Sequence, residues 1–171
     1  RRHTRYIGDW SSDVCSSDLS LYFLENGEKM TKFNVYDGMG CILLKEVGIE
    51  LIILTARHSD AIIKRFKDLG IKKIFTNILK KREFIKEYSK THNLNKKELA
   101  MMGDDLQDLS ALDEVNVFFT TPNAIDLVKE KATYVTKRYG GEGAVREICD
   151  LIISSKGSNS ALEFESYINK G

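Results

Sequence analysis

The sequence predicts an α/β domain built on a parallel sheet with helices on both faces, to which one β-hairpin is added. Short apolar runs alternate with segments of helical period from residue 50 onward, and this alternation is the order that builds such a sheet. The 171 residues suffice for one hydrophobic core, and 42% hydrophobic with 30% charged residues is typical of a soluble globular protein.

Charge and cysteine content narrow the class of protein. Lys and Arg number 26 against 25 Asp and Glu, which argues against a nucleic-acid partner, because affinity for phosphate backbones needs a concentrated basic surface. No apolar run approaches the roughly 20 residues of a membrane helix, so we expect no membrane partner. Cys15, Cys41 and Cys149 lack the spacing of a disulfide framework or a zinc site, and this favours a reducing, cytoplasmic location.

Residues 1–19 (RRHTRYIGDWSSDVCSSDL) differ from the rest of the chain. They show neither helical nor strand period and lack the apolar stretch of a signal peptide. Back-translated, they resemble a common sequencing-library adapter. We therefore expect an artefactual, non-native segment outside the fold; the alternative is a polar N-terminal extension. Either interpretation gives His3, Trp10 and Cys15 no functional role.

The next part of the chain predicts a hairpin followed by a first strand–helix pair. Leu21–Val35 contains two strand-like runs around Asn26-Gly27, a strong hairpin turn signal. A helix is expected over Asp37–Val47, closed by Gly48. The continuous apolar run Glu50–Leu54 predicts a buried strand, and a helix that Ser59 or Asp60 caps should follow it and end at Gly70.

The same alternation continues to the end of the domain. Strands are expected near residues 73–76, 99–102, 115–120 and 133–136. Helices are expected near residues 81–92, after 104, and near residues 123–131 and 143–155. The tail, residues 156–171, opens with a Gly/Ser/Asn linker and is expected to be peripheral, with room for a short last helix.

Three groups of polar residues follow the predicted strands, where ligands bind in parallel sheets. Thr55-Ala56-Arg57 places a hydroxyl at a strand end, and Gly103-Asp104-Asp105-Leu106-Gln107-Asp108 places three carboxylates at another. Lys80-Lys81 opens a helix between them. Carboxylates with substrate oxygens and water suit Mg²⁺, while a hydroxyl and a lysine suit the phosphate of a bound ester.

Each group also has a structural interpretation. Thr55 could be a helix cap, and Lys80 and Lys81 could be solvated surface charges. The acidic cluster could cap a helix and interact with its dipole. Taken together, the three groups favour phosphoryl transfer.

A resemblance becomes specific at this point. Leu54-Thr55, the lysine opening a later helix and Gly103-Asp104-Asp105-x-x-Asp108 resemble the second, third and fourth motifs of the haloacid dehalogenase-like superfamily of Mg²⁺-dependent phosphatases. The hairpin, Tyr36-Asp37-Gly38-Met39-Gly40 and the stretch GGEGAVRE at 140–147 are similar to the branch containing 3-deoxy-D-manno-octulosonate 8-phosphate phosphatase. The resemblance implies a Rossmann-like sheet with no cap domain, a phosphatase domain over residues 20–155 and a Mg²⁺ cofactor.

The resemblance also implies roles for individual residues. Thr55 would hold an oxygen of the transferring phosphoryl group, and Lys81 would neutralise charge on nucleophile and phosphate. Asp104 would bind the metal, and Asp108 would support it from behind. Arg57 would bind the carboxylate of the substrate, unless it is an ordinary surface arginine.

The chain departs from the family pattern at several positions. Ala56 replaces a glycine, Tyr36 an arginine and Gln107 an asparagine. The Asp-x-Asp-Gly motif of the nucleophile and acid/base is absent, and neither Asp13 nor Asp18 substitutes for it. We therefore expect a domain that is truncated at its N-terminus and inactive, with exposed ladders on both strands that would flank the missing one.

The implied partner is a small-molecule sugar-acid phosphate, and the intact parent is expected to form a homotetramer through the hairpin. Two alternatives stay open. One is a phosphatase of the same branch that acts on a nonulosonate 9-phosphate. The other is a non-catalytic oligomerisation module that keeps the fold without the chemistry.

Overall fold

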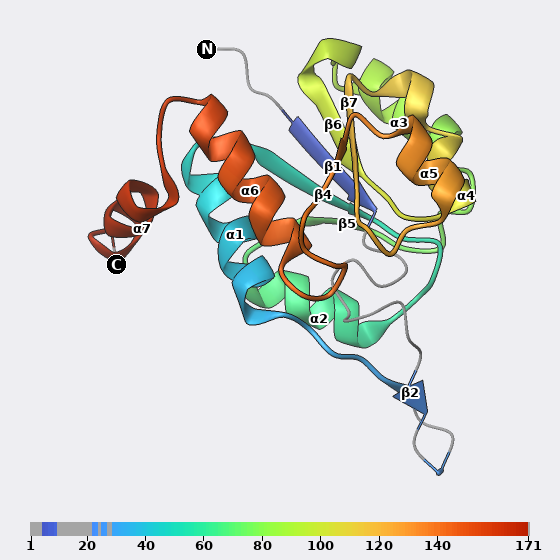
Figure 1. The fold of residues 1–171 in the computed structure, drawn as a ribbon, viewed down its shortest axis with the longest axis horizontal. Helices are drawn as coiled ribbons and strands as arrows, with labels where there is room; N and C mark the ends of the chain where they lie inside the picture. The colour runs from blue at the N-terminus through green and yellow to red at the C-terminus, as the bar shows by residue number, and fades with distance from the viewer. Residues whose placement is uncertain (1–4, 10–21, 24, 27–28, 171) are drawn as a thin grey trace.

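A computed structural model describes residues 5–9, 22–23, 25–26 and 29–170. A parallel sheet runs through the centre of this part of the chain, in the order β5-β4-β1-β6-β7-β8 (Figure 1). The strands are β1 (Arg5–Asp9), β4 (Glu50–Leu54), β5 (Lys73–Phe75), β6 (Leu99–Met102), β7 (Val117–Thr120) and β8 (Tyr134–Val135). The predicted parallel α/β fold is confirmed.

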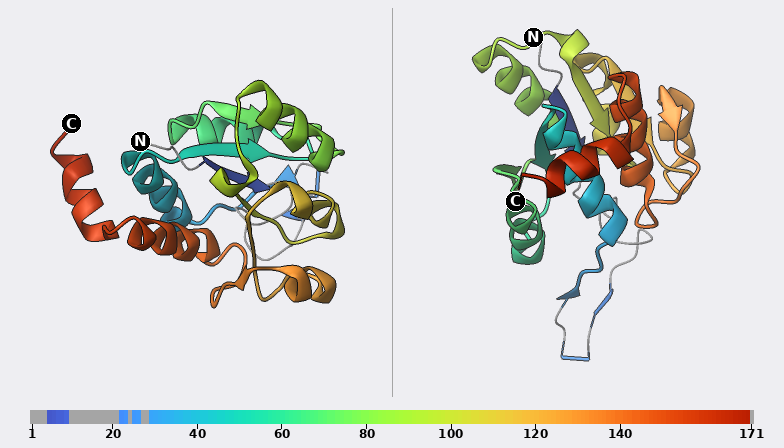
Figure 2. Two further views of the ribbon diagram at one scale, coloured as in Figure 1. Left: turned by 90° about the horizontal axis from the view of Figure 1, so that it is seen from above. Right: turned by 90° about the vertical axis from the view of Figure 1, so that its left-hand side faces the viewer.

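Helices lie on both sides of this sheet (Figure 2). They are α1 (Val35–Glu46), α2 (Asp60–Asp68), α3 (Lys81–Thr91), α4 (Leu106–Leu109), α5 (Asp126–Lys131), α6 (Ala144–Ser155) and α7 (Ser160–Ile168), with 3₁₀ turns at Lys96–Glu98 and Leu112–Glu114. Within the described ranges, no helix has the length and apolar character needed to cross a membrane.

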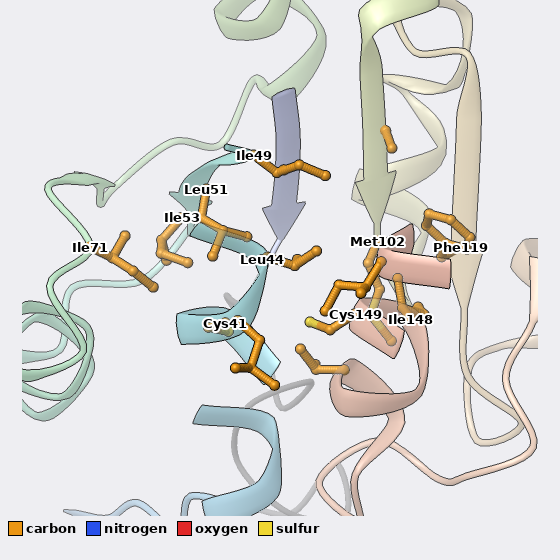
Figure 3. Packing of buried hydrophobic residues seen from close by; sticks show 14 of the residues in the cluster. Cys41, Leu44, Ile49, Leu51, Ile53, Ile71, Met102, Phe119, Ile148 and Cys149 are labelled. Atoms are coloured by element: carbon orange, nitrogen blue, oxygen red, sulfur yellow. The ribbon is translucent and has the colours of Figure 1, made fainter. Parts of the chain in front are cut away.

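The core is divided between the two faces because successive strand residues point to opposite sides. On β4, Leu51 and Ile53 join one cluster while Ile52 and Leu54 join the other. The first cluster packs under α1, α2 and α6, where Cys41 and Leu44 meet Ile148 and Cys149 (Figure 3). The second cluster packs under α3 and α5. This two-sided burial explains why β4 reads as a continuous apolar run.

The expectation that residues 1–19 lie outside the fold is wrong for Arg5–Asp9. This segment forms β1 and pairs in parallel with both β4 and β6. The ladders of β4 and β6 are therefore covered rather than exposed. These five residues form a strand although their sequence pattern is weak, because the strand pairs with a neighbouring strand on each side and strand preference depends strongly on such context. His3, Trp10, Asp13, Cys15 and Asp18 lie outside the described residues.

The predicted hairpin is present, and its strands are β2 (Tyr22–Phe23) and β3 (Lys29–Met30). It extends away from the sheet in Figure 1 and in the right-hand view of Figure 2. Gly27 of the predicted turn is outside the described residues. At the other end of the chain, the tail contains the expected short helix, α7, which packs against α1 and more lightly against α6.

Two helices begin at positions that differ from the prediction. Helix α1 starts at Val35 because the Asn34 side chain accepts the backbone N–H of Tyr36 at 2.8 Å. Helix α5 starts at Asp126 rather than near residue 123, because the backbone N–H of Ile125 donates to the Asp104 carbonyl. The later start of α5 therefore ties its N-terminus to the loop that follows β6.

Candidate active site

The predicted site residues follow strands of one sheet at one edge. Thr55 follows β4, and Gly103 and Asp104 follow β6. Strand β1 separates β4 from β6 in the sheet. Two inter-strand spacings amount to about 10 Å, a span that a phosphate group with its metal and hydrogen-bond donors can bridge.

Thr55 is fully buried and is held by its backbone on both sides. Its N–H donates to the Phe75 carbonyl, and its carbonyl accepts the N–H of Ile78, both at 2.9 Å. Its Oγ1 accepts the backbone N–H of Arg57 at 3.1 Å, which closes a local turn. The alternative interpretation of Thr55 as a helix cap is wrong, because Ser59 caps α2.

Lys81 and Asp108 form a buried ion pair. Lys81 Nζ donates to Asp108 Oδ1 at 2.6 Å, and the two side chains are 1% and 0% exposed. Asp108 Oδ2 accepts the backbone N–H groups of Asp104 and Asp105, at 2.9 and 3.0 Å. Both oxygens of Asp108 therefore have partners, so this carboxylate orients Lys81 and the Asp104 backbone.

The close approach of Asp108 to the loop depends on Gly103. A Cβ at position 103 would lie 2.4 Å from the Cβ of Asp108, a distance that real contacts do not show. Glycine at this position lets the loop after β6 fold over the carboxylate. The glycine of the Gly103-Asp104-Asp105 sequence is therefore required by packing.

The donor set at this edge fits Mg²⁺. Asp104 is a buried carboxylate, 4% exposed, at the end of a strand, and its backbone is fixed by Asp108. Mg²⁺ commonly takes one or two carboxylates and completes its shell with water and phosphate oxygens. Within the described residues no group of three His, Cys, Asp or Glu side chains forms a complete metal site.

The remaining predicted residues are less constrained. Arg57 and Lys80 are exposed, and Lys80 precedes α3 without a capping hydrogen bond from its side chain. Asp105 caps α4, since its Oδ1 accepts the N–H of Leu106 at 2.7 Å. The helix-capping interpretation is thus correct for Asp105 and for Asp108, whose Oδ2 accepts the N–H of Asp105 in a capping box. Unlike Asp105, the side chains of Lys81, Asp104 and Asp108 are buried.

Sequence reasoning missed two acidic residues. Asp9 ends β1 opposite Leu54, so its backbone stands at this edge between Thr55 and Gly103. Asp9 was not predicted because residues 1–19 were interpreted as a non-native segment outside the fold. The sequence feature that indicates it is a short apolar pair, Tyr6-Ile7, followed by Gly-Asp.

The second missed residue, Asp37, lies on α1 and is 1% exposed. Its Oδ1 accepts the backbone N–H of Arg146 in the first turn of α6 at 2.8 Å. Burial raises the pKa of Asp37 from 3.8 to about 6, although the N–H groups of Arg146 and Gly143 and the charge of Arg138 oppose this shift. The co-occurrence of Asp37-Gly38 with the 140–147 stretch was the only signal in the sequence.

A parallel sheet with a hydroxyl, a lysine and an acidic loop at its carboxyl edge defines a phosphoryl-transfer hydrolase of the α/β class. The model of the haloacid dehalogenase-like hydrolases matches residues 73–148. A 3-deoxy-D-manno-octulosonate 8-phosphate phosphatase of Haemophilus influenzae is 32% identical over 88% of this chain and 84% of its own length. The enzyme of the same name from Yersinia pestis is 35% identical over 82% of this chain and 75% of its own.

Solved structures agree with these relatives. The crystal structure of the phosphatase from Moraxella catarrhalis, in complex with magnesium, phosphate and a KDO molecule, aligns with a TM-score of 0.84 at 30% identity. The alignment covers 98% of this chain and 92% of that one. This chain belongs to the haloacid dehalogenase-like hydrolases and, within them, to the family of 3-deoxy-D-manno-octulosonate 8-phosphate phosphatases.

Proposed function

We propose that this chain carries most of the site of a Mg²⁺-dependent phosphatase that hydrolyses 3-deoxy-D-manno-octulosonate 8-phosphate in the synthesis of lipopolysaccharide precursors. The observation that supports this most strongly is the buried Lys81–Asp108 pair, whose carboxylate also holds the backbone of Asp104. A surface lysine or a simple helix cap would not need this arrangement.

In the proposed reaction, each residue acts on one part of the ester. The Thr55 hydroxyl donates to a phosphoryl oxygen, and Lys81 neutralises charge on the nucleophile and the phosphate. Asp104 holds the metal, while Asp108 fixes the positions of Lys81 and the Asp104 backbone. Bound Mg²⁺ supplies positive charge to the phosphate oxygens. Arg57, exposed at the same edge, pairs with the carboxylate of the sugar acid.

The chemistry needs two further carboxylates from the first strand. One attacks phosphorus and becomes an aspartyl phosphate, and the other donates a proton to the leaving alcohol. In this chain the sequence after the end of β1 is Asp9-Trp10-Ser11-Ser12, so a serine stands where the second carboxylate belongs. We propose that the sequence of residues 1–19 is foreign to the phosphatase although Arg5–Asp9 occupies the place of a strand between β4 and β6, that residues 20–155 form the rest of its domain and that residues 156–171 are a tail.

Activity measurements test this proposal directly. The chain should hydrolyse phosphate esters with Mg²⁺ at a rate lower by on the order of a millionfold than an intact enzyme, because part of a cooperating set is missing. The Ser11→Asp/Ser12→Gly double variant restores Asp-x-Asp-Gly at the end of β1 and should gain activity. Adding Asp9→Asn to that variant should abolish the gain. Strong activity of the unchanged chain would contradict the missing-motif interpretation.

The substrate is tested on the restored variant. The octulosonate 8-phosphate should be hydrolysed faster than a nonulosonate 9-phosphate. The reason is Arg57, the residue at which the family resemblance favours the octulosonate as substrate. Arg57→Met should reduce this preference while leaving hydrolysis of a phosphate ester without a carboxylate unchanged. A stronger preference for the nonulosonate ester would assign the chain to that alternative.

Assembly and location complete the proposal. We propose a cytoplasmic enzyme whose intact parent forms a homotetramer, with the β2–β3 hairpin as the interface element. Its extension away from the sheet leaves the two strands available to a neighbouring subunit (Figure 2). Sedimentation of the chain with and without residues 22–30 tests this, since removal of the hairpin should give the monomer.

A further inference from the structure

Helix α6 starts without a side-chain cap of its own. Its N-cap residue is Gly143, in the left-handed region with φ 98°, and the N–H groups of the first turn need acceptors. The carboxylate of Asp37 on α1 supplies one, because its Oδ1 accepts the N–H of Arg146 at 2.8 Å. The acceptor and donor are 109 residues apart in sequence, so this is a cap formed across the fold.

The loop at residues 137–143, which precedes α6, is attached to the start of α1 and to α6. Asn34 at the start of α1 donates its Nδ2–H to the Gly141 carbonyl at 3.2 Å. Glu147 of α6 accepts the backbone N–H groups of Lys137 and Arg138 at 2.9 to 3.0 Å. These contacts place the loop between the start of α1 and the first turns of α6.

The same loop also reaches the candidate active site. The Gly140 N–H donates to Asn123 Oδ1 at 2.8 Å, and Asn123 lies in the loop after β7. Two residues further on, the N–H of Ile125 donates to the carbonyl of Asp104 at 3.3 Å. Hydrogen bonds therefore connect the start of α1, through the 137–143 loop, to the backbone of the candidate metal ligand.

We infer that Asp37 is a positioning residue: it caps α6 from α1, and the charge on its carboxyl sets how tightly the 137–143 loop is held beside the phosphate site. The inference rests on the proposed function only in naming that edge a phosphate site. Two opposing effects act on the carboxylate. The N–H groups and dipole of α6 favour its charged form, while burial disfavours it.

Burial is the larger of the two effects, since the pKa of Asp37 is raised to about 6. Opening the loop would return the carboxyl to water and to its usual pKa. The closed loop therefore binds the proton more tightly than the open loop, so closure is most favoured below pH 4, weakens as the pH rises to about 6 and stays constant above it. At neutral pH the loop is held by a buried charge that gains solvation whenever the loop opens.

Several other charged or titratable groups lie near Asp37, and their contributions to the pH dependence must be distinguished from its own. Arg138 in the loop and Arg146 on α6 oppose the upward shift of its pKa. Cys41 on α1 and Cys149 on α6 are buried, and burial, with a smaller contribution from the charge of Asp37, raises the pKa of Cys149 well above its usual value. Arg65 of α2 lies against neighbouring Gly38. Comparison of the unchanged chain with Asp37→Asn separates the effect of Asp37 from theirs, because these groups are the same in both proteins.

Native-state hydrogen exchange of the full chain tests the inference. After correction for intrinsic rates, the opening equilibrium of the Gly140–Arg146 amides should rise about tenfold between pH 5 and 7.5. Asp37→Asn keeps an oxygen acceptor without the charge, so its opening should be independent of pH and on the order of tenfold lower than that of the unchanged chain at pH 5. Asp37→Ala removes the acceptor and should increase opening at both pH values.

A control and two results decide the outcome. Asp68→Asn removes an exposed carboxylate of α2 that pairs with Lys64, and its exchange in the loop should match that of the unchanged chain. Opening that does not depend on pH in the unchanged chain, or that depends on pH equally in Asp37→Asn, overturns the inference. Exchange is measured without substrate, so absent phosphatase activity would count against the proposed function alone.

Discussion

The Lys81–Asp108 pair shows how single residues shape this site. Taking two charges out of water costs free energy, which is recovered only when each charge keeps good partners. Asp108 meets this condition with Lys81 on one oxygen and two backbone N–H groups on the other. Removing the lysine would leave a buried carboxylate with less compensation.

We therefore expect Lys81→Met to lower the free energy of unfolding by about 3 to 5 kcal/mol. Lys80→Met is the matched control, because Lys80 is exposed and adjacent; its effect should stay within about 0.5 kcal/mol. Urea denaturation of both variants at pH 7 measures the difference. Equal stability of the two variants would show that the ion pair does not matter for folding.

A functional residue can be predicted from the sequence when the features that position it lie close to it in the chain. Thr55, Lys81 and Asp104 follow strand ends or open a helix, and parallel strands bring their carboxyl ends to one edge. Asp37 was not predicted because its partner is 109 residues away and is a backbone N–H, which leaves no trace in the identity of that residue.

At the scale of elements, the N-terminus of α6 is constrained both by its backbone and by a neighbouring side chain. Gly143 combines a φ of 98° with an Arg138 guanidinium that would lie 2.8 Å from an added Cβ. Gly157 also has a positive φ, 79°, but nothing lies within 4 Å of its added Cβ. A substitution at Gly157 therefore introduces backbone strain alone, whereas a substitution at Gly143 introduces backbone strain and also displaces the Arg138 side chain.

Gly143→Ala should destabilise the protein by about 1 to 3 kcal/mol, and Gly157→Ala should have a smaller effect, near 1 kcal/mol. Thermal unfolding of the two variants and the unchanged chain provides the measurement. If Gly157→Ala proved the more harmful substitution, the position of Arg138 over α6 would be wrong.

The contact between α1 and α6 also makes stability depend on pH. The pKa of Asp37 is raised by burial from 3.8 to about 6, so the folded state binds this proton more tightly than the unfolded state. The contribution of this group to stability is therefore largest below pH 4, falls as the pH rises to 6 and is constant above.

Asp37→Asn removes this dependence. The unfolding free energy of the variant, relative to the unchanged chain, should rise by on the order of 3 kcal/mol between pH 4 and pH 7. Paired denaturation curves across this range measure the difference, and all other titrating groups cancel in it. A difference that stays constant with pH would show that the carboxylate is not buried as described.

Most elements were predictable because their signals are short-range. Continuous apolar runs gave β4 and β6 their bounds, and Asn34 and Ser59 cap α1 and α2 through local hydrogen bonds. Strand β1 was not predictable, since its five residues carry a weak pattern and gain their conformation from β4 and β6.

At the scale of the whole molecule, the carboxyl edge of the sheet works as one unit. Thr55, the Asp104 loop and the end of β1 come from distant parts of the chain, yet the sheet order makes them neighbours. The metal and the two carboxylates of the first-strand motif would meet there, and one of these carboxylates is missing, so its loss is expected to inactivate the whole site.

Metal dependence is the expectation for the assembled site. In the Ser11→Asp/Ser12→Gly variant, EDTA should abolish hydrolysis and added Mg²⁺ should restore it, whereas Ca²⁺ should support much less activity because it prefers more ligands and longer bonds. Rates measured across a metal titration provide the test. Hydrolysis that persists in EDTA would remove Asp104 from the role proposed for it.

The position of β1 also bears on the order in which the protein can be made. Arg5 pairs with Glu50 on one side and with Leu99 on the other, so a strand translated first acquires its second neighbour only after more than half the chain has left the ribosome. Until then, one side of the nascent strand presents unbonded amides and carbonyls to its surroundings. The second ladder of β1 can accordingly be completed only once Met102, the partner of Gly8, has emerged.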